Sequence, residues 1–273
     1  MKRRYKILLT VILLIVFIIS PFFQFASSVI VMSVYSLSEA NNSLLKKENI
    51  EIDMPGGWST LKKDWYPFVM TFNNDEGFSD FSGKDVELSI LYNFGAFEYL
   101  KGASTYYNLK SPYFDSFYGA YVVKEKGFAF GYEEDGTPDF DEMALVPQYD
   151  LNVLVLQSIG CQHPRFSFQM DQTYKEAYFL GYNDWNVIEG TISTQSPMHR
   201  VTEKYQAYIQ YGKPPETRGA STDFEDIEVK GKIYARYFPE KKCSIFLYII
   251  APNDEAVIKC DKDFLQKTEI KLN

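Results

Sequence analysis

The sequence predicts a β-rich α+β fold, built mainly of antiparallel strands, that follows an N-terminal transmembrane helix. Three observations lead to this prediction. An uncharged apolar stretch occupies most of the first 38 residues. Short runs further along alternate apolar and polar residues, which is the period-2 pattern of a half-buried strand. Turn residues containing Gly and Pro separate these runs, so that several of them are arranged as hairpins and a C-terminal meander.

The N-terminal segment has the features of a membrane anchor. Residues 7–38 contain no charged side chain, and this 32-residue window exceeds the stretch of about 20 apolar residues that a spanning helix needs. Four positively charged side chains precede it: Lys2, Arg3, Arg4 and Lys6. We therefore expect residues 7–35 to lie in a lipid bilayer. The positive charges predict a single-pass protein in the cell membrane, with a cytoplasmic N-terminus and the C-terminal domain outside.

A cleaved signal peptide is the alternative for this segment. A basic start, an apolar core and a break at Ser20-Pro21 are all typical of one, and cleavage would release a secreted protein. Small residues suited to a cleavage site occur at Ala26 and Ser28, and again at Ser38 and Ala40. The uncleaved anchor is favoured because the apolar run resumes beyond the first of these sites. Both alternatives export the rest of the chain.

The remaining chain is divided by composition and charge. Residues 1–38 are assigned to the anchor, residues 39–50 to a short polar stalk and residues 51–273 to one extracytoplasmic domain. Residues 40–273 hold 24 basic and 35 acidic side chains, a net charge of −11, against −8 for the whole chain. Such an acidic domain is not expected to bind nucleic acid, which requires a basic face to meet the phosphates.

The first half of the domain contains two strand signals. Residues 86–94 alternate apolar and polar side chains over their length. Residues 120–124 and 128–132 predict a hairpin turned at Lys126 and Gly127. Further on, residues 187–193 and 201–211 are expected to pair across a turn at 195–197, although the second run also fits a helix.

The clearest pattern lies at the C-terminus. Residues 232–238, 243–250 and 256–260 are separated by two turn segments and predict a three-stranded meander. One helix stands out earlier in the chain, with Asp150 as its N-cap and Gly160 at its end. Its apolar face consists of Leu151, Leu154, Val155 and Ile159.

Two of the three cysteines are candidates for a disulfide. Cys243 and Cys260 lie on neighbouring strands of the predicted meander, at equal distances from the turn between them. In a symmetric hairpin they face each other at a Cα separation of about 5.5 Å, which permits the bond, and export favours its persistence. Two buried thiols are the alternative. Cys161 is left over, and its neighbour His163 does not indicate catalysis because adjacency in sequence does not bring base and nucleophile together.

An acidic loop is the candidate for a calcium site. Residues 133–142 contain six carboxylates around a Gly and Pro turn, and Ca²⁺ takes six to eight oxygen ligands. The candidate ligands are Glu133, Asp135, Asp139 and Asp141. The spacing is not that of an EF-hand, and a solvated acidic loop is the alternative. No other cofactor is predicted.

Aromatic residues make up 17% of the chain, and several gather in residues 106–118. Exposed rings in such a segment stack on sugars or seat a protein partner. The candidate residues are Tyr106, Tyr107, Tyr113, Phe114 and Tyr118. The alternative is that these rings fill a β-rich core, where aromatic strand propensity favours them.

These features favour a membrane-tethered extracytoplasmic domain with a binding or accessory role at the cell envelope. Its partners would be the bilayer and a membrane or envelope protein. No nucleotide-binding, zinc-protease or serine-hydrolase motif occurs in the sequence. The alternative function is an exported glycan-directed hydrolase, which needs only two carboxylates flanking the bond. Candidates for that pair are Asp64, Glu98, Asp115, Asp139, Asp141 and Asp184.

Overall fold

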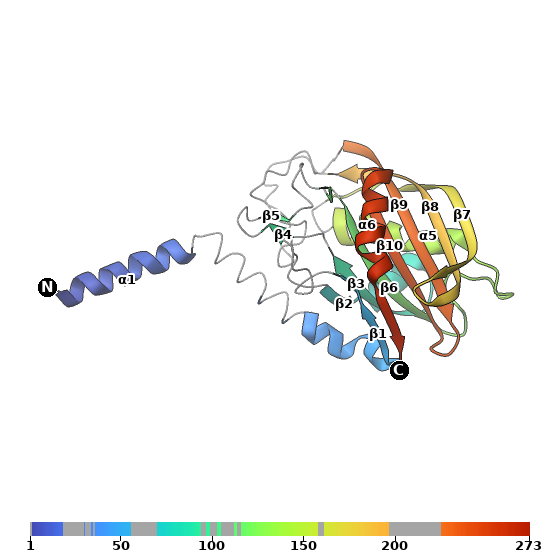
Figure 1. Ribbon diagram of the computed structural model, residues 1–273, viewed down its shortest axis with the longest axis horizontal. Coiled ribbons are helices and arrows are strands. Elements are labelled where there is room, and N and C mark those ends of the chain that lie inside the picture. The colour runs from blue at the N-terminus through green and yellow to red at the C-terminus, as the bar shows by residue number, and fades with distance from the viewer. Residues whose placement is uncertain are drawn as a thin grey trace.

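A seven-stranded antiparallel sheet with the strand order β2-β3-β6-β10-β9-β8-β7 organises the fold (Figure 1). The computed structural model describes residues 2–18, 30, 34, 36–55, 70–93, 97–98, 103–104, 112–113, 116–157, 161–196 and 225–273. The strands of the large sheet are β2 (Met70–Asn73), β3 (Val86–Asn93), β6 (Phe117–Glu125), β7 (Ser167–Phe179), β8 (Tyr182–Ser196), β9 (Glu225–Phe238) and β10 (Cys243–Ala251). The prediction of a β-rich, mainly antiparallel fold is confirmed.

Two small sheets and several helices complete the described chain. One small sheet pairs β1 (Ile50–Asp53) with β11 (Glu269–Leu272), and the other pairs β4 (Phe97–Glu98) with β5 (Ala103–Ser104). The helices are α1 (Lys2–Ile18), α3 (Leu44–Lys47), α4 (Asp75–Ser82), α5 (Phe140–Tyr149), the π-helical segment η3 (Asp150–Leu156), α6 (Asp254–Asp263) and the 3-10 turn η6 (Leu265–Lys267).

Strand β10 lies at the centre of the sheet and is buried along its whole length. It pairs with β6 on one side and with β9 on the other. Phe246, Tyr248 and Ile250 point into a core layer beneath α4, α5 and η3. The alternate side chains, among them Leu247, point into a second layer beneath α3, α6 and the β1–β11 sheet. Covered on both faces, the strand is a continuous apolar run.

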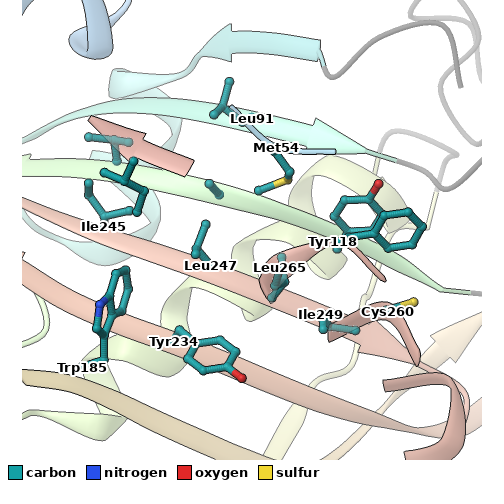
Figure 2. Close-up of a cluster of buried hydrophobic side chains, with 14 of the residues drawn as sticks. Met54, Leu91, Tyr118, Trp185, Tyr234, Ile245, Leu247, Ile249, Cys260 and Leu265 are labelled. Carbon is teal, nitrogen blue, oxygen red and sulfur yellow. The ribbon is translucent and has the colours of Figure 1, made fainter. Parts of the chain in front are cut away.

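The second layer is shown in Figure 2. Leu91, Tyr118, Trp185, Tyr234 and Leu247 come from five different strands of the sheet and are all buried. In Figure 1, α6 lies on the near side of the sheet and α5 on the far side. The domain core is therefore two apolar layers separated by the sheet, in keeping with the way that domains are built around packed layers.

Helix α6 corrects the third strand predicted for residues 256–260. The Asn253 side chain accepts a hydrogen bond from the Ala256 amide at 2.9 Å, which caps the helix, and Asp254 and Glu255 occupy its first turn. Both features favour a helix start. The other two segments of the predicted meander pair as β9 and β10, with Phe238 opposite Cys243.

The predicted helix start at Asp150 is also corrected. The N-cap of helix α5 lies eleven residues earlier, where the Asp139 side chain accepts a hydrogen bond from the Glu142 amide at 3.0 Å. The helix contains Pro147 and then continues into η3. Proline removes a donor from the helix interior and normally marks an end, which is why the sequence suggested a later start. The Asp150 carboxylate instead accepts hydrogen bonds from the hydroxyls of Tyr121 and Tyr248 inside the core.

Two further expectations differ from the structure. Residues 43–50 are packed against the domain instead of forming a free polar stalk: Leu44 and Leu45 are buried, and the Leu44 amide donates to Ser89 Oγ at 2.8 Å. Residues 128–132 form turns, with the Tyr132 amide donating to the Ala129 carbonyl, because β6 already pairs with β3 and β10. The strand or helix expected at 201–211 lies outside the described residues.

At the N-terminus, α1 spans 17 residues and its apolar side chains are exposed. Most of the remaining apolar stretch, from residue 19 to residue 35, lies outside the described residues. Among the residues that are described, no helix combines the length and the apolar character needed to cross a membrane.

A buried ion pair attaches α6 to the sheet. The Lys232 ammonium on β9 lies 3.0 Å from an Asp261 carboxylate oxygen, and Tyr234 donates its hydroxyl to the same carboxylate at 2.9 Å. Glu189 on β8 forms a second ion pair with Lys232, at 2.9 Å. Burial alone would lower the pKa of Lys232, but the hydrogen bonds to Tyr234 and Glu189 outweigh it and raise that pKa. The side chains of Lys232 and Asp261 are largely buried.

We expect Asp261→Ala to lower the free energy of unfolding by about 3 kcal/mol, since breaking a buried pair leaves an uncompensated charge. Denaturant unfolding of the detergent-solubilised full-length protein measures this value. The exposed neighbour substitution Lys262→Ala is the control. Equal stability of the two variants would contradict the assigned role of Asp261.

Two facing glycines determine how β7 packs on the sheet. Gly190 on β8 pairs with Gly231 on β9. A Cβ atom at Gly190 would lie 2.3 Å from the Gln169 carbonyl oxygen and 2.5 Å from a ring carbon of Phe168. The missing side chains therefore leave the space that the Phe168 ring occupies.

Gly190→Ala should lower the free energy of unfolding by about 1–3 kcal/mol, because a backbone oxygen cannot move aside as a flexible side chain can. The same denaturant titration measures the loss, with the exposed substitution Ser193→Ala on the same strand as control. A Gly190→Ala variant as stable as Ser193→Ala would show that β7 is free to shift.

Candidate functional site

A groove of about 690 Å³ lies at one end of the large sheet. It forms where β3 begins, β6 ends and β9 turns into β10. The Lys126 amide still donates to the Asp85 carbonyl at 3.2 Å, after which Gly127, with φ 89°, directs the chain out of the sheet. The residues that line the groove are Asp85, Val86, Glu87, Lys124, Glu125, Lys126, Gly127, Phe128, Tyr237, Pro239 and Lys242. Its volume is within the range of ligand sites in proteins.

The apolar part of the groove includes an exposed aromatic ring. Phe128 is 53% exposed, and Tyr237 near the end of β9 and Pro239 in the turn after it also line the groove. Tyr237 contacts the ring of Tyr132 beneath it, with ring centroids 6.2 Å apart. Phe128, Tyr237 and Pro239 together give the groove an apolar part beside its charged side chains.

The carboxylates of the groove are paired with lysines. Glu87 lies 2.7 Å from Lys47, and Asp85 lies 3.8 Å from Lys126. Lys124 is bonded to Glu48 of the segment before β1. In the described part of the chain, Lys242 is the groove lysine that forms no ion pair. The groove therefore contains one lysine without an ionic partner, although its lining as a whole balances three lysines with three acidic side chains.

Two buried carboxylates share one lysine at the inner end of the groove. The Lys84 ammonium lies 3.4 Å from Glu125 and 3.0 Å from Glu142, and the Gly131 amide donates to the second oxygen of Glu142 at 2.7 Å. Burial raises the pKa of Glu125, and the charge of Glu142 raises it further, while Lys84 opposes both. The hydrogen bond to Glu142 raises the pKa of Lys84. This cluster connects α5 to the end of β6.

The carboxylates predicted for a hydrolase are not brought together in the groove. Asp139 caps α5, Asp141 is exposed in the first turn of that helix, and Asp184 is exposed on β8. None of these three lines the groove. Asp64 and Asp115 lie outside the described residues, and Glu98 belongs to the short strand β4.

The predicted calcium ligands are engaged within their own loop. Asp135 accepts the Thr137 amide at 2.8 Å, and its hydrogen bonds to Thr137 lower the pKa of its carboxyl. Asp139 serves as the helix cap, while Glu133 and Asp141 are exposed. Across the residues that the structure describes, no three His, Cys, Asp or Glu side chains converge as metal ligands would.

Two of the predicted aromatic contact residues hold α6 in place. Tyr118 is buried, stacks on Phe264 at 4.3 Å between ring centroids and donates its hydroxyl to the Pro55 carbonyl. Tyr113 donates to Asp263 at 2.8 Å, and burial together with this bond raises its pKa to about 12. Tyr106, Tyr107 and Phe114 lie outside the described residues.

In the structure, Cys243 and Cys260 form no disulfide with each other, and all three cysteines are buried. A strand advances about 3.3 Å per residue but a helix returns only about 1.5 Å. Cys260 on α6 therefore reaches back only as far as Ile249, beside which it lies in Figure 2, while Cys243 is at the far end of β10. Burial raises the pKa of each of these two thiols to about 12. Near Cys161, His163 is exposed.

The sequence did not identify this groove. Its residues come from three separate segments and form no motif, and Phe128 was assigned to a hairpin strand. The available signals were the Lys126-Gly127 turn and the run of Pro239 to Lys242, both of which were interpreted only as turns.

The raised pKa of Glu125 gives a pH-dependent prediction. A carboxyl whose pKa is higher in the folded state favours folding below its ordinary pKa of 4.5, and this contribution disappears as pH rises through the folded-state value. A glutamine at this position has no titratable carboxyl group and therefore lacks this pH-dependent contribution. The melting temperature of Glu125→Gln, relative to wild type, should therefore be higher at pH 7 than at pH 4 in thermal unfolding scans.

The exposed substitution Glu255→Gln controls for the loss of one surface carboxylate. A relative melting temperature of Glu125→Gln that falls between pH 4 and pH 7 would mean that Lys84 dominates the environment of Glu125.

Comparisons with known proteins give no relative from which a function could be transferred. The chain matches no family model, no curated protein and no solved structure. Its function is therefore argued from the groove and from the N-terminal segment.

Proposed function

We propose that the protein is a membrane-tethered extracytoplasmic domain that binds a partner at the cell envelope through this groove. The observation that carries the proposal is the composition of the groove: an exposed Phe128 ring and an unpaired Lys242 line it, next to the central strand β10, which is buried on both faces. A rigid scaffold that presents an aromatic ring and a free charge is suited to recognition.

The tether is proposed from the character of α1. Ten of its apolar side chains are between 43% and 60% exposed: Ile7, Leu8, Leu9, Val11, Ile12, Leu13, Leu14, Ile15, Val16 and Phe17. Consecutive helical residues point in directions about 100° apart, so this run is apolar around the whole circumference. A helix of this kind is stable in lipid, and the cationic residues before it favour a cytoplasmic N-terminus.

Binding is better supported than hydrolysis by the carboxylate geometry. A glycosidase needs two carboxyl groups on either side of the scissile bond. Glu125 lines the groove, but Glu142 is held by the Gly131 amide behind it, and both carboxylates contact the same lysine. This arrangement gives the pair a structural role in joining α5 to β6.

Membrane fractionation tests the tether. We expect the wild-type protein to remain in the membrane pellet after an alkaline carbonate wash. Leu13→Arg should shift it to the soluble fraction, because an arginine at the centre of a spanning helix costs about 2.5–3.5 kcal/mol. Leu13→Phe is the matched apolar control.

Mass spectrometry of the pelleted protein separates the anchor from the signal peptide. Retention of residues 1–38 supports the anchor, and their loss would indicate cleavage. A wild-type protein that is washed off the membrane would contradict the tether altogether.

A further inference from the structure

We infer that the groove recognises an extended peptide segment of a partner protein in which a carboxylate stands next to an apolar side chain. The inference rests on the proposed function, because it names the chemical class of the partner that the same groove would bind. Three features of the groove support it: its free charge, its exposed ring and its free main-chain groups.

The unpaired ammonium group of Lys242 favours a ligand with an anionic group. The other charged side chains that line it are in ion pairs, and the pair between Lys126 and Asp85 is long and exposed at 3.8 Å. Lys242 has no ionic partner in the described chain, and Lys126, which lines the same groove, is only loosely paired. A carboxylate that pairs with Lys242 gains a charge-assisted hydrogen bond that displaces no existing ion pair.

The charge of the whole domain limits how acidic the partner segment can be. Residues 40–273 carry a net charge of −11. A polyanion such as nucleic acid or an anionic wall polymer is repelled by most of the surface. A short segment with one or two carboxylates can pair with Lys242 without this penalty, which favours a peptide over a polymer.

The exposed ring selects an apolar neighbour for that carboxylate. Phe128 is separated from Lys126 by one residue, and Tyr237 and Pro239 line the same groove. Binding removes the half-exposed ring of Phe128 from water, which is the main source of affinity in small contact sites.

The main chain at Gly127 selects a peptide over a free acid. A Cβ atom built on Gly127 would meet nothing within 4 Å, so the backbone is open at this point. The amides of Gly127 and Phe128 form no hydrogen bond with any other residue that the structure describes. Open main-chain amides beside an apolar contact can donate hydrogen bonds to the carbonyl oxygens of an extended peptide.

Selection from a random heptapeptide display library on the immobilised full-length protein in uncharged detergent tests the inference. We expect the recovered sequences to combine Asp or Glu with an adjacent aliphatic or aromatic residue. Fluorescence anisotropy with the most frequent peptide, and with the same peptide carrying Asn or Gln in place of its acid, then measures affinity. The amide version should bind about tenfold more weakly.

Three variants locate the binding to the groove. Phe128→Ser and Lys242→Glu should each weaken the selected peptide by about tenfold, because the first removes the ring and the second reverses the charge. Lys262→Glu makes the same charge reversal on the exposed face of α6 and should leave binding unchanged. Thermal unfolding of each variant checks that it is folded, and Lys126→Glu replaces any variant that is not.

Several outcomes would overturn the inference. These are the recovery of no peptide, recovery of sequences without the acidic and apolar pair, or equal binding by all variants. Binding of vesicles that contain phosphatidylglycerol, abolished by Lys242→Glu and without peptide binding, would assign the groove to lipid. If the protein stays in the membrane after the carbonate wash but binds no peptide, only the inference of a peptide ligand is rejected. If the protein binds the peptide but is washed off the membrane, only the proposed membrane tether is rejected.

Discussion

The burial of strand β10 on both faces is the constraint on which the rest of the structure depends. Every residue of this strand is buried, and its two neighbours, β6 and β9, satisfy its main-chain hydrogen bonds. Both faces of the sheet must therefore be covered, by α4, α5 and η3 on one side and by α3, α6 and the β1–β11 sheet on the other. Two buried acidic side chains have partners: Asp150 accepts hydrogen bonds from two tyrosines, and Asp261 is paired with Lys232. Buried polar groups without such partners would offset much of the gain from apolar burial.

The groove is a consequence of the same arrangement. Where β6 ends and the β9–β10 turn begins, the apolar layers also end, so charged side chains lie beside a hydrophobic edge. Ion pairs compensate nearly all of these charges, and the cluster of Lys84, Glu125 and Glu142 fixes the inner end. Lys242, in the turn before β10, and the exposed Phe128, in the bend after β6, directly adjoin the ends of these paired strands. Main chain anchored so close by limits the entropy lost when a partner binds.

Much of the sheet could be predicted from the sequence because its determinants are local. The alternation in β3 and the turn between β9 and β10 specify strands through side-chain period and turn chemistry. Residues 256–260 were misassigned because five residues show too little periodicity, while the cap at Asn253 held the decisive signal. Helix α5 was missed because Pro147 normally ends a helix, and here the continuous turn into η3 accommodates it. The predicted disulfide between Cys243 and Cys260 assumed that residues 256–260 form a strand, and they form part of helix α6 instead.

The sequence by itself determined the antiparallel β-rich class, the central apolar strand and the acidic character of the domain, because these depend on composition and short-range pattern. It also shows the cationic apolar N-terminus from which the tether is proposed. Only the tertiary structure decided which charges are neutralised: Glu87 meets Lys47, and Glu125 meets Lys84, while Lys242 meets no acid among the described residues. It also placed Phe128 in the same groove as Lys242, more than a hundred residues away in the chain. Such pairings arise from strand register and long-range contact, which a linear pattern does not encode.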